Sequence, residues 1–364
     1  MENPGQGTGM PSSESSGMRF KAAIKRAYKR YLLDAMGAMG MGLLASLVIG
    51  LILSQLSKIP GLGILAEYSK MVGAANPVVG ATVGVAIASV LKVSTLAMLA
   101  SAGAGALGYA MGGPVGAYCS SVVAAELGNL VTGKTKVDII VVPVVTLVTG
   151  GLIATWLSPG INAAIGALQR FIEMATTFQP VPAGIVIAMI FGLTLTGPIS
   201  SAGLAAMVFT VPEGQVAGQG LLLAAGAATV GCACHMVGFA VSSYRENGIG
   251  GLIAQGLGTS KIQMGNAFRR PIILVPPTLA AAILGPFATT VFQMKNISAS
   301  AGMGTSGLVG QFGTWANMAG ENPALLITKI LLMHFLMPAA ISLLVSEYMR
   351  KKNWIHEGDM KLNL

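Results

Sequence analysis

Long apolar stretches recur through this chain of 364 residues and constrain its fold more than any other feature. A helix needs about 20 apolar residues to cross the roughly 30 Å hydrocarbon core of a bilayer. Five stretches of that length lie at 32–56, 138–158, 183–211, 271–293 and 323–347. Charged residues make up only 10% of the chain, whereas soluble domains carry about 25%. The sequence therefore predicts an all-α polytopic membrane protein embedded in a lipid bilayer.

Three further apolar regions are broken by glycine, proline or a single charge. They lie at 77–112, 114–132 and 216–244. If each broken region forms one or two crossings, the total is eight to ten, and we expect about ten transmembrane helices.

The two ends of the chain are basic. Six Lys or Arg residues and no acid lie between residues 19 and 30, and Arg350, Lys351 and Lys352 follow the last apolar stretch. The positive-inside rule then places both termini in the cytoplasm. We expect a disordered leader at 1–18, a basic amphipathic segment on the lipid surface at 19–31, and a cytoplasmic tail at 348–364. A nucleic acid is not an expected partner, because positive-inside placement already explains the basic segment.

A short polar signature occurs twice in the second half, as Gly256-Leu257-Gly258-Thr259-Ser260 and Gly302-Met303-Gly304-Thr305-Ser306. A nucleotide-binding loop would need a strand before it and a helix after it, and a P-loop would also need a Gly-Lys-Ser/Thr ending. Re-entrant hairpins at 248–268 and 297–320 fit the polar surroundings better, because irregular backbone at membrane depth must line a cavity or be buried in protein. Ordinary loops outside the membrane remain an alternative.

Polar side chains within or beside the apolar segments are the candidate site residues, since such groups are rare in membranes unless they function. The candidates for binding a solute are Glu126, Ser200, Ser201, His235, Arg245, Glu246, Asn247, Gln255, Thr259, Ser260, Thr305, Ser306 and Gln311. Their carboxylates and amides would bind hydroxyl groups, and Arg245 would pair with Glu246 or with an anionic group. For Ser200 and Ser201 a structural role is an equal alternative, because hydroxyls can satisfy carbonyls freed by Pro198.

Cys232-Ala233-Cys234-His235 contains soft metal ligands, but no second cluster supplies the rest of a tetrahedral site. Close packing of small residues on a glycine-rich helix explains it better. We therefore expect no metal and no cofactor.

An amphipathic segment divides the chain into two halves. Residues 159–182 are expected to connect a first half, 32–158, to a second half, 183–347, along the membrane interface. Transporters are often built from two such repeats.

Several blocks of the sequence resemble the enzyme IIC-like membrane components of the bacterial sugar phosphotransferase system, in particular the perfringolysin regulator-like subgroup. The resemblance covers about residues 32–347 and is carried by Gly112–Ala117, Ala125–Gly128, Gly133–Ile140, Pro198–Ser201, Gly231–Cys232, Met236–Ala240, Ser243–Asn247, Gly256–Ser260 and Gly302–Gln311.

The resemblance implies a ten-helix permease with re-entrant hairpins, an amphipathic connector and usually a homodimer. In that family the IIC component binds a sugar and exposes it to a phosphorylated IIB partner. The Gly-Ile-Thr-Glu motif of many sugar porters is absent here, and we expect no attached IIA or IIB domain.

Two functional hypotheses follow. The first is an EIIC-like permease of the bacterial cytoplasmic membrane that translocates a small polar, sugar-like solute and works with separate IIA and IIB proteins. The second is a membrane-embedded regulator or sensor that binds a solute without transporting it. The chain contains no catalytic constellation of its own, so any enzymatic role would be that of the membrane component of a phosphotransferase complex.

Overall fold

The computed structural model describes residues 22–73, 76–211 and 215–362, and within these ranges the chain forms helices and no strands. Two shorter apolar helices, Val78–Val90 and Pro180–Thr196, accompany the helices that are long and apolar enough to cross a membrane. In the described ranges those six long helices are Ala22–Leu56, Thr95–Val131, Asp138–Phe178, Gln219–Ser242, Pro271–Thr289 and Pro323–Lys351. The all-α polytopic class is confirmed, whereas helix lengths alone do not establish the predicted number of about ten crossings.

The first half begins with one continuous helix, whose consecutive segments are η1 (Tyr28–Ala35), α2 (Met36–Leu43), η2 (Leu44–Val48) and α3 (Ile49–Leu56). A short helix, α4 (Leu65–Met71), precedes α5 (Val78–Val90), which packs beside α2. Their buried contact is made by small and branched side chains, with Ala38, Val79 and Val83 fully buried.

The next helix, α6 (Thr95–Val131), is folded back on itself. Its backbone leaves the helical conformation at Gly112 and Gly113, where Gly113 has a φ of 58° that favours glycine, and Pro114 begins the second arm. The two ends meet, because Ser94 and Thr132 hydroxyls lie 2.9 Å apart. Hence α6 is a hairpin of two antiparallel arms, each about 25 Å long at 1.5 Å per residue.

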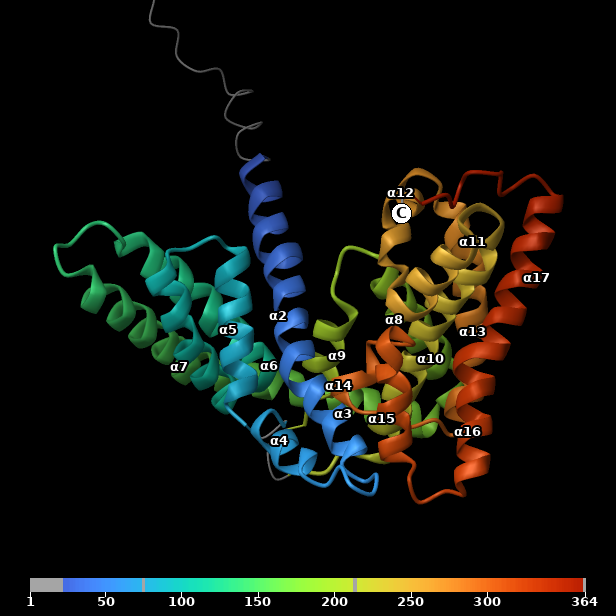
Figure 1. The fold of residues 1–364 in the computed structure, drawn as a ribbon, viewed down its shortest axis with the longest axis horizontal. Coiled ribbons are helices and arrows are strands. Elements are labelled where there is room, and N and C mark those ends of the chain that lie inside the picture. The colour runs from blue at the N-terminus through green and yellow to red at the C-terminus, as the bar shows by residue number, and fades with distance from the viewer. Residues whose placement is uncertain (1–21, 74–75, 212–214, 363–364) are drawn as a thin grey trace, which may run out of the picture.

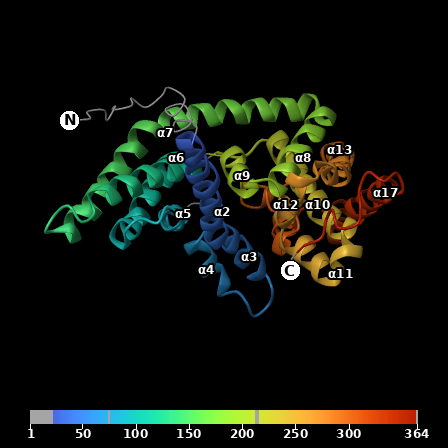
Figure 2. The ribbon, with the colours of Figure 1, turned by 90° about the horizontal axis from the view of Figure 1, so that it is seen from above.

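A single helix of 41 residues, α7 (Asp138–Phe178), joins the two halves. Seen from above, it runs along one edge of the molecule from α6 to α8 (Figure 2). Residues 159–178 of the expected connector, 159–182, form the second part of this helix, which continues through Pro159 without a break, and residues 180–182 begin α8. A membrane-embedded helix tolerates proline because neighbouring groups satisfy the freed backbone.

The second half is built around α10 (Gln219–Ser242). In the most apolar 18-residue stretch of this helix, 94% of the residues are buried. It packs against α8 (Pro180–Thr196) and α13 (Val275–Thr289). The stretch 183–211, predicted as one span, is divided instead. The helix α8 ends at Thr196, and α9 (Ser201–Phe209) begins after a break.

Two irregular segments interrupt this half and carry the two polar signatures. The first contains α11 (Tyr244–Ile253), η3 (Ala254–Gly258), η4 (Ser260–Gln263) and α12 (Met264–Arg269), and η5 (Pro271–Leu274) leads from it into α13. The second contains α14 (Ser298–Ala301), η6 (Ser306–Leu308) and α15 (Val309–Asn317), followed by α16 (Pro323–Leu331), η7 (Leu332–Leu336) and α17 (Met337–Lys351). The helices α11 and α12 lie at the end of the molecule that carries the C-terminus, and α14 and α15 lie toward the opposite end (Figure 1).

Candidate functional site

The two polar signatures, which are 46 residues apart in the chain, meet in the folded protein. The fully buried Thr305 donates a hydrogen bond from Oγ1 to the carbonyl of Gly256 at 2.5 Å. Gly304 has a φ of 54°, and a Cβ at this residue would lie 2.8 Å from the backbone of Cys232 in α10. The signatures therefore form one junction, seated against the central helix. We call the residues 256–260 and 302–306 together the signature junction.

A buried chain of hydroxyl groups and an imidazole continues from the junction. Ser260 Oγ lies 2.8 Å from Thr196 Oγ1, which lies 3.0 Å from Nδ1 of His235. On its other side, His235 Nε2 lies 3.2 Å from Thr278 Oγ1. All four side chains can both donate and accept, so the chain can be satisfied without any charge. It ties η4, α8, α10 and α13 together behind the junction.

The carbonyls at the break between α8 and α9 are also satisfied from the first signature segment. Lys261 Nζ donates to the carbonyls of Gly197 and Ile199, each at 2.9 Å. Ser200 Oγ accepts from the N–H of Gly203 and so caps α9, while Ser201 Oγ donates to the carbonyl of Gly302 at 2.7 Å. Thus Ser201 reaches the signature junction, and Ser200 serves the local helix.

The amides of the first signature segment bind one another and the C-terminal tail. Gln263 Nε2 donates both to Gln255 Oε1 and to the carbonyl of Met360, each at 2.9 Å. Asn247 holds the same tail residues, accepting from the N–H of Leu362 and donating to Met360. The tail is therefore docked on this segment. We call residues 355–362 the docked tail.

The charged candidates form ion pairs that differ from the expected one. Arg245 binds Glu347 rather than Glu246, and Glu246 binds Arg350 at 2.9 Å. Glu246 and Arg350 lie 104 residues apart, and their side chains are only 3% and 12% exposed. Glu246 also accepts from the N–H of Met360, so this buried pair fixes the last transmembrane helix and the docked tail together.

The docked tail also has an acid-sensitive contact outside the membrane-spanning helices. Partial burial raises the pKa of Asp359, but the backbone N–H of His356 and the guanidinium of Arg270 outweigh it and hold that pKa below its ordinary value. A carboxyl group whose pKa is lowered by folding stabilises the folded state at pH values above its unfolded pKa of about 3.9. This stabilisation is lost as the pH falls through the lower pKa of the folded state.

We therefore predict that the tail loosens in acid below about pH 4. The fluorescence of Trp354, which contacts Tyr348 edge to face, should shift over this range. In Asp359→Asn the same acid step should be absent. A step of equal size in this variant would contradict the assignment.

Three further candidates lie away from the signature junction or bind locally. Glu126 accepts from Arg30 Nε at 2.8 Å and from the Tyr31 hydroxyl at 3.0 Å, which ties the first helix to α6. Thr259 accepts from the N–H of Lys261 and starts η4. Gln311 donates to His334 Nδ1 at 3.0 Å and so ties α15 to η7 of the last long helix.

Sequence reasoning missed several residues that complete this polar core. Asn296 is fully buried and donates to Thr229 Oγ1 at 2.7 Å, while its Oδ1 accepts from Ser300. A lone amide in a long polar block gives no signal of its own. The π-helical turn η7 around His334 could not be predicted from the sequence either, although such turns often occur at functional positions.

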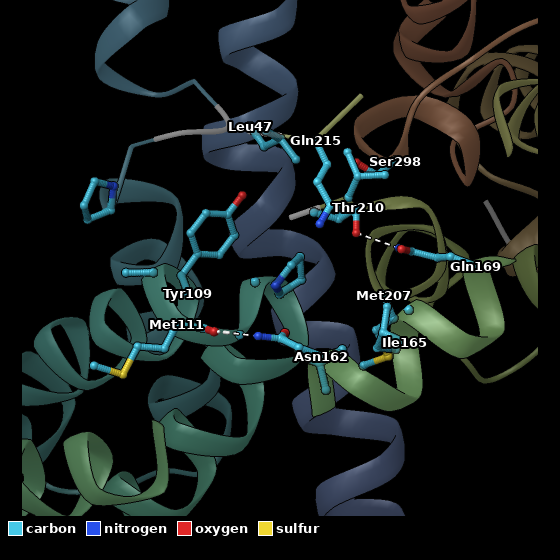
Figure 3. A pocket seen from close by; sticks show the side chains of 18 residues that line it. Leu47, Tyr109, Met111, Asn162, Ile165, Gln169, Met207, Thr210, Gln215 and Ser298 are labelled. Atoms are coloured by element: carbon cyan, nitrogen blue, oxygen red, sulfur yellow. Dashed lines mark hydrogen bonds between the residues drawn. The ribbon is translucent and has the colours of Figure 1, made fainter. Parts of the chain in front are cut away.

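A cavity of about 480 Å³ lies between the two halves and contains none of the predicted site residues in its lining (Figure 3). It is bounded by the tip of the α6 hairpin, the middle of α7 and the end of α9, with Leu47 and Ser298 closing it on the other side. Asn162 Nδ2 donates to Met111 at the tip, and Gln169 Nε2 donates to the carbonyls of Val208 and Thr210. Such a volume is in the range of small-molecule sites.

Comparison with known proteins gives one match. The family described as "Phosphotransferase system, EIIC" matches residues 33–362. The chain belongs to this EIIC family. A search of curated proteins and a search of solved structures both give no match.

Family membership makes this EIIC chain a multi-pass membrane protein and a membrane component of sugar transport. The matched region begins in the first helix and ends within the docked tail. The family domain therefore includes the signature junction, the cavity and the tail contacts.

Proposed function

We propose that this EIIC chain translocates a small polar, sugar-like solute, and that the signature junction is a closed barrier on its pathway. The contact between Thr305 and Gly256 carries the proposal, because two segments entering from opposite ends of the molecule meet there (Figure 1). A barrier built from two separate segments can open when one segment moves relative to the other. Ser201, Ser260 and His235 lie around this contact and would face the solute when it opens.

The polar surroundings suit such a role. The hydrogen-bonded series that runs from Ser260 through Thr196 and His235 to Thr278 consists of groups that can donate or accept without a charge. Carboxylates and amides at Glu246, Asn247, Gln255 and Gln311 are bound to protein groups in this closed arrangement. We infer that they position the segments around the pathway. Arg245, Thr259, Ser306, Ser200 and Glu126 complete the proposed set of residues that affect the solute.

The proposed orientation places both termini in the cytoplasm of a bacterial cell. The first helix begins, and the chain ends, at the same end of the molecule (Figure 1). Basic residues occur in the turn before α7, at the end of α12 and at the end of α17, segments that also lie at this end. The positive-inside rule supports this orientation.

Separate IIA and IIB proteins would then meet the chain on its cytoplasmic face, where IIB would phosphorylate the arriving sugar. A homodimer and the perfringolysin regulator-like subgroup belong to the same proposal and rest on the sequence resemblance. Family membership supports transport over the sensor hypothesis.

Uptake measurements test the transport proposal directly. Membrane vesicles containing the full chain are supplied with radiolabelled neutral sugars, with and without IIA, IIB and a phosphoryl donor. Accumulation above vesicles that lack the chain is the expected result. If no sugar accumulates under either condition while transcription of neighbouring genes changes in a deletion strain, the sensor hypothesis replaces transport.

Thr305→Val tests the barrier. The substitution keeps the side-chain volume but leaves the half-buried carbonyl of Gly256 without its donor, which should destabilise the closed arrangement by about 0.5–1.5 kcal/mol. We expect a lower thermal midpoint and altered uptake, whereas Thr305→Ser, which keeps the hydroxyl, should behave like the wild type. Equal uptake by all three proteins would remove the junction from the pathway.

A further inference from the structure

We propose that the cavity at the tip of the α6 hairpin is the solute-binding chamber, and that it selects neutral, polyhydroxylated molecules. This inference rests on the proposed transport function. It places recognition in a part of the chain that contains none of the residues predicted from the sequence.

The chemistry of the walls defines the class of ligand. Among the described residues that line the cavity, none carries a charge. The polar side chains carry amides and hydroxyls, contributed by Tyr109, Asn162, Gln169, Thr210, Gln215 and Ser298. Such groups both donate and accept, as sugar hydroxyls do. A charged ligand would find no counter-ion among these described residues, which would leave its desolvation uncompensated by them.

The backbone at the tip of the hairpin also forms part of the cavity wall. The bend at Gly112 and Gly113 lines the cavity, together with Pro114 and Val115 at the start of the second arm. The first N–H groups of a helix have no partner within that helix. A broken membrane helix that lines a cavity is a recurrent way of building a solute site.

Thr210 supplies the most specific observation. Its Oγ1 is buried and has no hydrogen-bond partner among the described residues, although the residue lines the cavity. A buried hydroxyl without a partner is unfavourable in the empty protein. The residue lines the cavity through its other atoms, so a turn of its side chain about Cα–Cβ would bring this hydroxyl to a ligand hydroxyl in the chamber.

The chamber lies close to the second signature. A smaller void of about 10 Å³ shares Leu47 and Ser298 with the chamber and is also lined by Met303. That volume is about the size needed for one water molecule. A solute in the chamber is therefore next to the signature junction but cannot pass until Leu47, Ser298 or Met303 moves.

Thermal-shift binding on the purified full-length chain tests the chamber. The probes are glucose, mannitol and galactitol as neutral molecules, and gluconate, glucosamine and glucose 6-phosphate as charged counterparts. We expect stabilisation by at least one neutral probe and none by the charged probes. Thr210→Val should weaken binding about tenfold while leaving the empty protein as stable as the wild type or more so. Thr155→Val, whose hydroxyl binds only its own helix and Met111 on the exposed side of α7, should change neither property.

Cysteine labelling gives a second measurement on the same protein. In a Cys119→Ser background, Ser298→Cys should react with a neutral maleimide, and the bound probe should slow that reaction severalfold. Thr155→Cys should react at a rate that the probe does not alter.

The outcomes separate this inference from the proposed function. A neutral sugar could be transported while Thr210→Val binds it as tightly as the wild type and the sugar leaves the labelling rate at residue 298 unchanged. In that case the assignment of the chamber is wrong and the transport proposal stands. If a charged probe binds as well as the neutral ones, the ligand class is wrong. If no probe binds and no sugar accumulates in vesicles, both proposals fail together.

Discussion

Glu246→Ala should release the docked tail and lower the free energy of unfolding by about 3–5 kcal/mol, the usual effect of removing one partner from a buried ion pair. Arg350 would be left nearly buried without the carboxylate, and its Nε already lacks a partner among the described residues. The N–H of Met360 would lose its acceptor as well. Thermal unfolding in detergent, together with the rate of proteolysis within the tail, measures both effects.

Arg245→Ala is the matched control. Arg245 also binds a glutamate, Glu347, at 2.8 Å, but its side chain is 70% exposed. An exposed pair contributes about 0–1 kcal/mol, so this variant should keep its tail and most of its stability. Equal losses in the two variants would show that burial of the Glu246 pair is not what fixes the tail.

Gly231→Ala should separate α10 from α8 and is expected to destabilise the fold by about 1–3 kcal/mol, as overpacking does. A Cβ on Gly231 would lie 2.0 Å from the carbonyl oxygen of Ala188 and 2.6 Å from its Cα. Both are backbone atoms, so the two helices must move apart. The yield of monodisperse protein and the thermal midpoint in detergent report the change.

Gly160→Ala controls for helix propensity. Gly160 also lies within an apolar helix, α7, but nothing lies within 4 Å of the position that a Cβ would take. Alanine favours a helix by about 1 kcal/mol over glycine, so this variant should be as stable as the wild type or more so. If Gly231→Ala behaved in the same way, close backbone contact would not be what organises the second half.

The sequence predicted the parts of the fold that depend on solvation. The bilayer determines which stretches can be spans, so the class of the fold and most span positions follow from apolar length alone. The break at Gly112-Gly113-Pro114 also separated two apolar regions in the sequence. What the pattern could not show is that the two arms fold back on each other, because this depends on contacts between residues such as Ser94 and Thr132.

Partner choice was the least predictable property of the site. A carboxylate such as Glu246 is recognisable as costly in an apolar segment, but its partner Arg350 follows 104 residues later. The nearest opposite charge in the sequence, Arg245, points to a different glutamate. The cavity was invisible for a related reason, since its lining residues come from six separate segments and none is unusual by itself.

The α6 hairpin has a mechanical consequence. Its arms are stiff, joined at the tip by Gly112 and Gly113 and tied at the base by the contacts of Ser94 with Asn129 and Thr132. A frame closed at both ends tilts as a unit, so any displacement of the tip must turn the base about a pivot between them. A dye attached at Lys136, in the turn beyond the base, should therefore respond to occupancy of a chamber about 25 Å away. The hairpin would thus transmit ligand binding in the chamber to its base at the surface of the protein.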